Sequence, residues 1–251
     1  NNIGYSRALV EGLKYIIPFS VDIVNMSLAV LCDEYKKEIE VLCSRIRDNG
    51  AIINVSVLNH ASTSFPASLD STLGIRGAFN VDPYKIWYNA KNEIQCVSNL
   101  TPVLVSNIDC KKTFFGGNSK ATALVSGLLA KAMYTMQIDG ENALKSLVIK
   151  TDWCEDDIQK EFTAPNKENV GVELLAFSEQ VCDFLKFNKK QRENILERTL
   201  FPPSIYIEKE QFICLIEYLS AFYHKEVILG QFEISNLSTI LSIYRYFKGE
   251  K

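Results

Sequence analysis

The sequence predicts an α/β fold, in which a mostly parallel sheet has helices on both faces, followed by a small all-α bundle. Two short apolar runs, residues 21–28 and 50–59, are each bounded by turn residues, as strands usually are. Between them, residues 32–48 show helical spacing, and alternating strands and helices are typical of a parallel sheet. After about residue 150 the patterns are helical only. We therefore expect an α/β domain at residues 1–150, a linker at 151–170 and a helical domain at 171–251.

The segment at residues 32–48 separates its apolar positions from its charged ones. One face carries the apolar side chains, and the other carries Lys, Glu and Arg; the apolar set is Tyr35, Ile39, Leu42, Cys43 and Ile46. A stripe of this kind packs a helix against other structure. The pattern predicts a helix that connects the two strands.

Residues 117–121, with the sequence Gly-Asn-Ser-Lys-Ala, run directly into a small and apolar stretch at 122–130. Gly117 allows a tight backbone turn, and Ser119 falls where the first amides of a helix point outward. Gly127, eight residues after the serine, is expected to let that helix pack closely against its neighbours. A serine at such a turn is a typical nucleophile, so the motif indicates a serine hydrolase.

Residues from about 5 to 147 resemble the subtilisin-like serine peptidases in the order of several motifs. A helix precedes an Asn-Met-Ser-Leu strand at 25–28, and a second helix leads to a strand that ends in Asn59. A Pro-Ala pair at 66–67, a strand at about 73–78, a further strand pair and the Gly-x-Ser-x-Ala helix follow. The resemblance covers a little over half of the chain. It implies a subtilisin-like sheet, incomplete in this chain, and an endopeptidase that processes a peptide or protein substrate.

The resemblance assigns the central chemistry to two residues. It implies that Ser119 is the nucleophile and that the side-chain amide of Asn59 helps to form the oxyanion hole. An amide donor aimed at the developing negative charge strengthens as the charge appears, and removing one such donor costs about 10²–10³ in rate. The motif also departs from the family: Lys120 replaces an apolar residue, and residues 123–124, Ala-Leu, replace Pro-His.

Other positions are implied to contact substrate. Ser27, Leu28 and Ala29 match the edge segment that pairs with an extended substrate through backbone hydrogen bonds. Around the oxyanion asparagine and the nucleophile, the candidate substrate-binding residues are Leu58, His60 and Asn118. Ala29 and Leu58 stand where the family usually has glycine, so their side chains are expected to narrow or block the primary specificity pocket.

The base that would activate Ser119 has no match in this chain. In the family an Asp and a His supply and orient that base, and a serine hydroxyl is a poor nucleophile without one. His60 and His224 are the two histidines of the sequence, and neither lies in a segment that resembles the family's Asp or His motif. We expect that this chain is the carboxyl-side portion of a longer protein, with the Asp and His on another segment or chain. The alternative is a pseudoenzyme that binds an extended peptide or a partner protein.

The last 80 residues carry helical patterns at 172–187, 208–224 and 237–247, with Pro202-Pro203 between the first two. Their spacing weakly resembles acyl- and peptidyl-carrier domains. Where carriers have Asp-Ser-Leu for phosphopantetheine attachment, this chain has residues 208–210, Glu-Lys-Glu, so no prosthetic arm is expected there. A plain helical bundle is the alternative, and in either case we expect this tail to bind a partner protein.

Composition excludes several other classes. The net charge of −3 gives no electrostatic case for nucleic acid or an anionic membrane, and no apolar run is long enough to span a bilayer. Seven scattered cysteines without a CxxC pair indicate reduced thiols in a cytoplasmic protein. No nucleotide-binding glycine motif occurs, and the acidic run at 155–157 is typical of a solvated linker rather than a metal site. We expect neither a cofactor nor a metal.

Overall fold

The computed structural model describes residues 5–59, 61–78, 81–106, 112–159, 171–193, 195–198, 200, 207–227, 237 and 239–249. The chain divides into two compact units. Unit 1 contains residues 1–101 and 116–158, and unit 2 contains residues 102–115 and 159–251.

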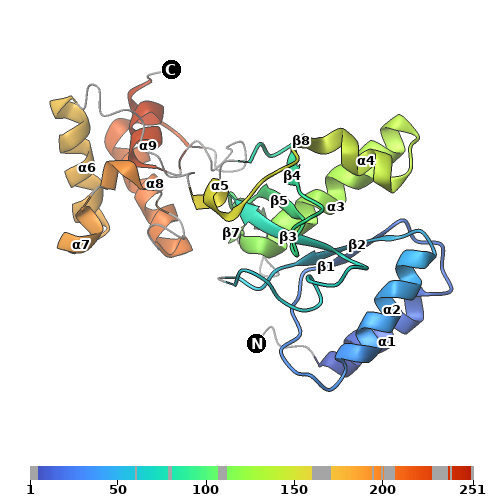
Figure 1. The fold of residues 1–251 in the computed structure, drawn as a ribbon. Coiled ribbons are helices and arrows are strands. Elements are labelled where there is room, and N and C mark those ends of the chain that lie inside the picture. The colour runs from blue at the N-terminus through green and yellow to red at the C-terminus, as the bar shows by residue number, and fades with distance from the viewer. Residues whose placement is uncertain are drawn as a thin grey trace. The chain divides into compact units, whose positions relative to one another are not determined.

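Unit 1 is a mixed α/β structure around one six-stranded sheet (Figure 1). The strand order is β1-β2-β3-β5-β4-β8, and all neighbours are parallel except the antiparallel pair β4 and β5. The strands are β1 (Ile23–Met26), β2 (Ile52–Ser56), β3 (Leu73–Ala78), β4 (Ile86–Tyr88), β5 (Cys96–Asn99) and β8 (Val148–Lys150). The expected fold class, mostly parallel with flanking helices, is confirmed.

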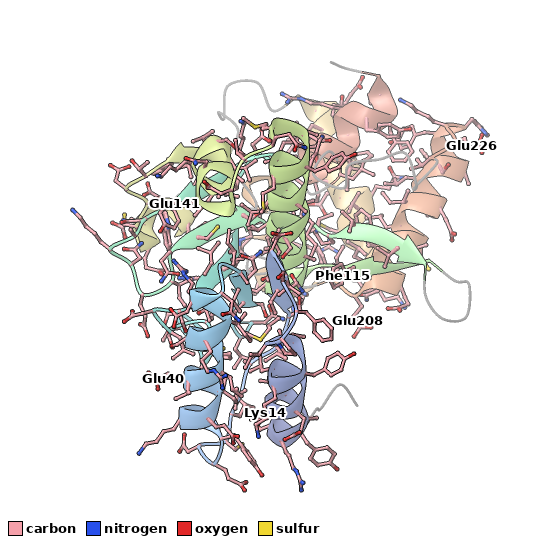
Figure 2. The ribbon with its side chains drawn as sticks, turned by 90° about the vertical axis from the view of Figure 1, so that its right-hand side faces the viewer. Lys14, Glu40, Phe115, Glu141, Glu208 and Glu226 are labelled. Carbon is pink, nitrogen blue, oxygen red and sulfur yellow. The ribbon has the colours of Figure 1, made fainter. Side chains whose placement is uncertain are left out.

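Helices α1 (Ser6–Ile16) and α2 (Lys36–Asp48) lie side by side on one face of this sheet (Figure 1). Lys14 of α1 pairs with Glu38 of α2 over 2.8 Å, and Figure 2 labels Lys14 at this helix pair. The expected apolar stripe of α2 is buried against the sheet, with Ile39 and Ile46 packed into the same core as Ile53 and Val55 of β2. Alternation along β2 sends these two strand residues to the α2 face.

Helices α3 (Gly117–Met136) and α4 (Gly140–Leu147) cover the opposite face (Figure 1). Ala121, Val125 and Leu129 of α3 recur at helical spacing and pack with Ile75 of β3 and Cys96 of β5. The expected reason for Gly127 is wrong. Gly127 is exposed, and a Cβ added there would meet no atom within 4 Å, so close packing does not require glycine at this position.

Residues 151–158, within the segment expected to be a linker, belong to unit 1. Trp153 is 2% exposed and packs with Trp87 and Val97, and its indole N–H donates to the carbonyl of Gln95 over 2.9 Å. The short helix α5 (Glu155–Gln159) follows it.

Unit 2 contains a two-stranded antiparallel hairpin and a set of helices. The strands are β6 (Val103–Ser106) and β7 (Lys112–Phe115), and Figure 2 labels Phe115 at the end of β7. The helices are α6 (Val172–Phe184), α7 (Lys189–Arg192), the 3₁₀ helix η2 (Ile195–Glu197), α8 (Lys209–Tyr223) and α9 (Ile240–Lys248). Helix α9 contacts α6, α8 and η2, and its Tyr244 meets Phe177 of α6 edge to face at 5.4 Å between ring centroids. A carrier-like arrangement of these helices stays a prediction.

Candidate active site

The turn into α3 requires glycine at its first residue. Gly117 has φ +77, in the left-handed region, and a Cβ added there would lie 3.0 Å from the Asn59 side-chain oxygen. Any other residue would be strained by the backbone angle and crowded by Asn59. The Asn59 side chain and the first turn of α3 therefore lie in direct contact.

Asn59 caps this helix from outside the helix. Its Oδ1 atom accepts the backbone N–H of Asn118 over 3.0 Å. With Oδ1 facing this amide, the Nδ2 group is left for another acceptor, and no described residue accepts from it. Because the first N–H groups of a helix have no partner within the helix, the Ser119 amide also points out of this turn. The start of α3 thus has two amide groups without an acceptor among the described residues, the Asn59 side-chain amide and the Ser119 backbone N–H.

The Asn118 side chain, which the sequence predicts to contact substrate, lies inside the fold. It is 9% exposed, its Oδ1 accepts the Gly77 N–H over 2.8 Å, and its Nδ2 donates to the Val57 carbonyl over 2.9 Å. These bonds tie α3 to β3 and to the end of β2. Substrate contact by Asn118 stays a prediction.

Ser119 is half-buried, two residues into α3. No described residue forms a hydrogen bond with its Oγ atom, whereas its backbone carbonyl accepts from the Ser27 hydroxyl over 3.3 Å. Ser27 and Leu28 are exposed just after β1, and Ala29 is half-buried. The segment predicted to pair with substrate therefore lies beside the nucleophile candidate.

Leu58 and His60 flank Asn59 in the sequence. Leu58 is 42% exposed, and its backbone N–H donates to the Ser64 hydroxyl over 2.9 Å. Its contact with substrate stays a prediction. His60 lies outside the described residues. His224 is the exposed C-terminal cap of α8 in unit 2, with a left-handed φ of 52.

Lys120 is a buried residue whose environment the sequence does not predict. It is 6% exposed, and its Nζ atom donates to the Asn99 carbonyl over 3.0 Å and to the Asn99 side-chain oxygen over 2.9 Å. Asn99 also donates to the Val81 carbonyl over 2.8 Å. The residue after the nucleophile candidate therefore ties α3 to the end of β5, where an apolar side chain would make no such bond.

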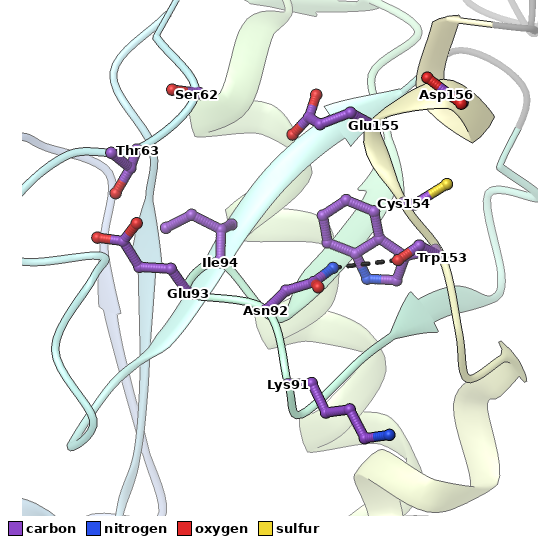
Figure 3. Close-up of a pocket in the computed structure, with 10 residues that line it drawn as sticks. All are labelled: Ser62, Thr63, Lys91, Asn92, Glu93, Ile94, Trp153, Cys154, Glu155 and Asp156. Atoms are coloured by element: carbon purple, nitrogen blue, oxygen red, sulfur yellow. Dashed lines mark hydrogen bonds between the residues drawn. The ribbon is translucent and has the colours of Figure 1, made fainter.

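Unit 1 also contains a pocket of about 600 Å³ (Figure 3). The described residues that line it include neither Ser119 nor Asn59. Figure 3 shows Glu93 and Glu155 along its wall, with the Asn92 amide donating to the Trp153 carbonyl over 3.1 Å. Glu155 also pairs with Arg76. Among the described residues, no group of three or more His, Cys, Asp or Glu is arranged to hold a metal ion.

Next to this pocket, a lysine and a helix turn lower the pKa of one carboxyl group. Lys150 pairs with Asp157 over 2.7 Å, and the Cys154 backbone N–H donates to the same carboxylate over 2.9 Å. Both contacts favour the ionised form, so they lower the pKa of Asp157 to about 2. The bonds hold α5 against β8.

The fold of this chain is similar to several solved protein structures. No family model matches the chain, and no curated protein matches it. The solved structures that resemble it include sphericase, with 16% identity and a TM-score of 0.47 over 57% of this chain and 55% of that chain. A psychrophilic protease has 14% identity and a TM-score of 0.46 over 60% of each chain. The prenylagaramide maturation protease PagA has 17% identity and a TM-score of 0.48 over 61% of this chain and 60% of that chain.

The chain thus spans 55–60% of the length of these proteins. Similarity at this level of identity and TM-score assigns no activity to the chain. The described helices include none that is both long and apolar enough to cross a bilayer.

Proposed function

We propose that this chain carries the nucleophile and the oxyanion-binding residue of a subtilisin-like serine endopeptidase that processes a peptide or protein substrate. The main support is the Asn59 side chain, whose oxygen accepts the Asn118 N–H at the start of α3, next in sequence to Ser119, and whose amide is left to donate to a ligand. The N-terminal end of α3 adds a positive partial charge at the same point. Together these donors suit the oxyanion of acyl transfer.

The base and its orienting carboxylate are proposed to come from sequence outside this chain. A general base must lie within about 2.6–3.2 Å of the hydroxyl that it deprotonates, and none of the described residues does so at Ser119. Strand β1 is an edge strand of the described sheet, paired only with β2. An unpaired strand edge can accept a further strand, which offers a route for such a segment to join the sheet.

Substrate is proposed to bind along Ser27, Leu28 and Ala29. These residues follow β1 directly and reach Ser119 through the Ser27 hydroxyl. An extended peptide adds to such an edge through backbone hydrogen bonds, and Leu58 would limit the side chain that fits beside Asn59. We assign Asn118 a structural part in this site, since both ends of its side-chain amide are used within the fold.

Labelling with a fluorophosphonate probe tests the nucleophile. In the complete protein we expect covalent labelling, loss of labelling in Ser119→Ala, and retained labelling in Ser146→Ala, which removes an exposed helical serine of α4. Labelling that survives Ser119→Ala would contradict the assignment.

The second candidate is a non-catalytic module that binds an extended peptide. It is favoured because no described residue forms a hydrogen bond with Ser119 Oγ. Three results together would support this module over the peptidase. The native, complete protein would show no fluorophosphonate labelling. It would bind peptide, and this binding would survive Ser27→Ala but be lost on substitution of residues at the β1 edge.

Unit 2 is proposed to bind a partner protein. Helix α8 begins at Lys209, where a carrier would have its attachment serine. An amine cannot form the phosphodiester, so incubation with coenzyme A and a phosphopantetheinyl transferase is expected to leave the mass of the chain unchanged. An added phosphopantetheine would contradict the proposal.

A further inference from the structure

A line of hydrogen bonds runs from the sheet interior toward the carbonyl of the nucleophile candidate. It begins at Asn54, on the face of β2 that meets α3, where Nδ2 donates to the Ser126 hydroxyl over 2.8 Å. The Ser126 hydroxyl lies 2.8 Å from the Asn25 side-chain oxygen and 3.0 Å from the Thr122 carbonyl, and it can donate to either. These contacts join β2, α3 and β1.

The second half of the line runs from β1 to Ser119. The Nδ2 atom of Asn25 donates to the Ser27 hydroxyl over 3.2 Å, and Ser27 donates to the Ser119 carbonyl over 3.3 Å. When Ser126 donates to Asn25, every donor from Asn54 onward points toward Ser119. Hydrogen bonds aligned in one direction polarise one another, so such a line is stronger than separate pairs.

An asparagine at position 54 is unfavourable for the stability of the fold. Its side chain is fully buried, and its Oδ1 atom has no hydrogen-bond partner among the residues that the structure describes. A buried acceptor without a partner destabilises a fold, whereas an apolar residue of similar shape would not. Packing alone therefore does not explain an asparagine at this position. The hydrogen bond that its side chain does make is the one from Nδ2 to the Ser126 hydroxyl.

We infer that Asn54, Ser126, Asn25 and Ser27 act as positioning residues, which fix the Ser119 carbonyl and hold the substrate-pairing segment at a set distance from the nucleophile. The inference rests on the proposed function. Fixing this carbonyl sets the peptide plane after Ser119, and so constrains the backbone from which the Cα–Cβ bond of the serine projects. Since Ser27 belongs to both the line and the substrate segment, the same bonds place substrate and nucleophile together.

Amide hydrogen exchange in the full chain tests this arrangement without requiring activity. The reporters are the Asn118 N–H, bonded to Asn59, and the Ala123 N–H, which in a helix donates to the Ser119 carbonyl. Removing one hydrogen bond in Ser126→Ala is expected to speed exchange at both amides about 2- to 10-fold. Ser126→Thr keeps the hydroxyl and is expected to restore slow exchange.

A matched control lies on the same helix. Thr135 donates to the Lys131 carbonyl over 2.7 Å, the same i to i−4 bond that Ser126 can make, but it is exposed and outside the line. Thr135→Ala is expected to leave both reporter amides unchanged. Equal effects of the two alanine variants, or faster exchange spread evenly through β2 and β3, would overturn the inference.

Asn54→Val separates positioning from stability. It removes the unpartnered oxygen, so the midpoint of chemical denaturation is expected to stay level or rise, while exchange at Asn118 and Ala123 quickens as in Ser126→Ala. A fall in the midpoint with unchanged exchange would mean a purely structural residue. Missing fluorophosphonate labelling in the unsubstituted protein would overturn the proposed function alone, because the exchange result does not depend on it.

Discussion

The side-chain oxygen of Asn59 accepts the backbone N–H of Asn118 over 3.0 Å. The two residues are far apart in sequence, and their contact brings the end of one strand segment to the start of α3. The bond orients the Asn59 amide, so one side chain both caps a helix and presents a donor. The two tasks use different atoms, and substitution can separate them.

Asn59→Asp is expected to keep the cap and lose the donor. The carboxylate can still accept the Asn118 N–H at the positive end of the helix, but it has no N–H to offer an oxyanion. In the complete, active protein we expect kcat to fall by about 10²–10³ or more, as for loss of one oxyanion donor. The denaturation midpoint is expected to remain close to that of the unsubstituted protein.

Asn59→Ala provides the comparison, since it removes both the cap and the donor. It is expected to lower kcat to a similar extent and also to lower the denaturation midpoint. Full activity in Asn59→Asp would exclude an oxyanion role for this side chain.

Gly117→Ala is expected to destabilise unit 1. Its left-handed backbone costs about 1–2 kcal/mol for a residue with a Cβ, and the crowding against Asn59 adds to this. Gly127→Ala, in the exposed middle of the same helix, is expected to stabilise by roughly 0.5–1 kcal/mol. Urea denaturation of both variants measures the contrast, and equal shifts would contradict it.

Asp157 is expected to make stability depend on acidic pH. Its pKa is about 2 in the folded chain and 3.8 for the free side chain, so folding favours the ionised form. Its stabilising contribution is complete above the free value and disappears as the pH falls from about 4 through 2.

A carboxyl ¹³C NMR titration checks the Asp157 prediction. Lys150→Met is expected to raise the pKa of Asp157, because it removes the largest cause of the shift. Lys145→Met, which removes a lysine paired with Glu141 instead, is expected to leave this titration unchanged. An unmoved pKa in Lys150→Met would contradict the assigned cause.

The cysteines are expected to react with a thiol reagent in two groups. The six cysteines that the structure describes are free thiols, of which Cys32, Cys154 and Cys214 are exposed. Burial raises the pKa of Cys43 to about 11 and raises that of Cys96 and Cys182 as well, so few of these thiols ionise near neutral pH. Mass spectrometry is expected to find early modification at the exposed group. Rapid modification of Cys96 in the native chain would contradict this.

The elements of the fold that could be predicted are those that a local sequence pattern specifies. The stripe from Tyr35 to Ile46 predicted α2 because its period is that of a helix, and the apolar runs predicted β1 and β2 because turn residues bound them. Trp153 was not predicted to be buried, since the segment around it is polar and has no period. The one feature that could have indicated its burial is a large aromatic residue within a polar segment.

The site was less predictable, because its contacts join residues that lie far apart in sequence. The positions of Ser119 and Asn59 follow from motifs, but the contact between Lys120 and Asn99 crosses from α3 to β5. The bond from Asn54 to Ser126 links residues 72 positions apart. No local period indicates that two such polar side chains will face each other between a strand and a helix.

The helix starts of unit 2 are specified by neighbouring side chains. Asn188 and Gln191 cap each other at the start of α7, Thr239 and Ser242 do so at the start of α9, and the Gln211 side chain accepts the Glu208 N–H before α8. These bonds span three residues and need no tertiary contact. The residues next to each cap therefore specify where these helices begin, whereas their stability still depends on packing against one another.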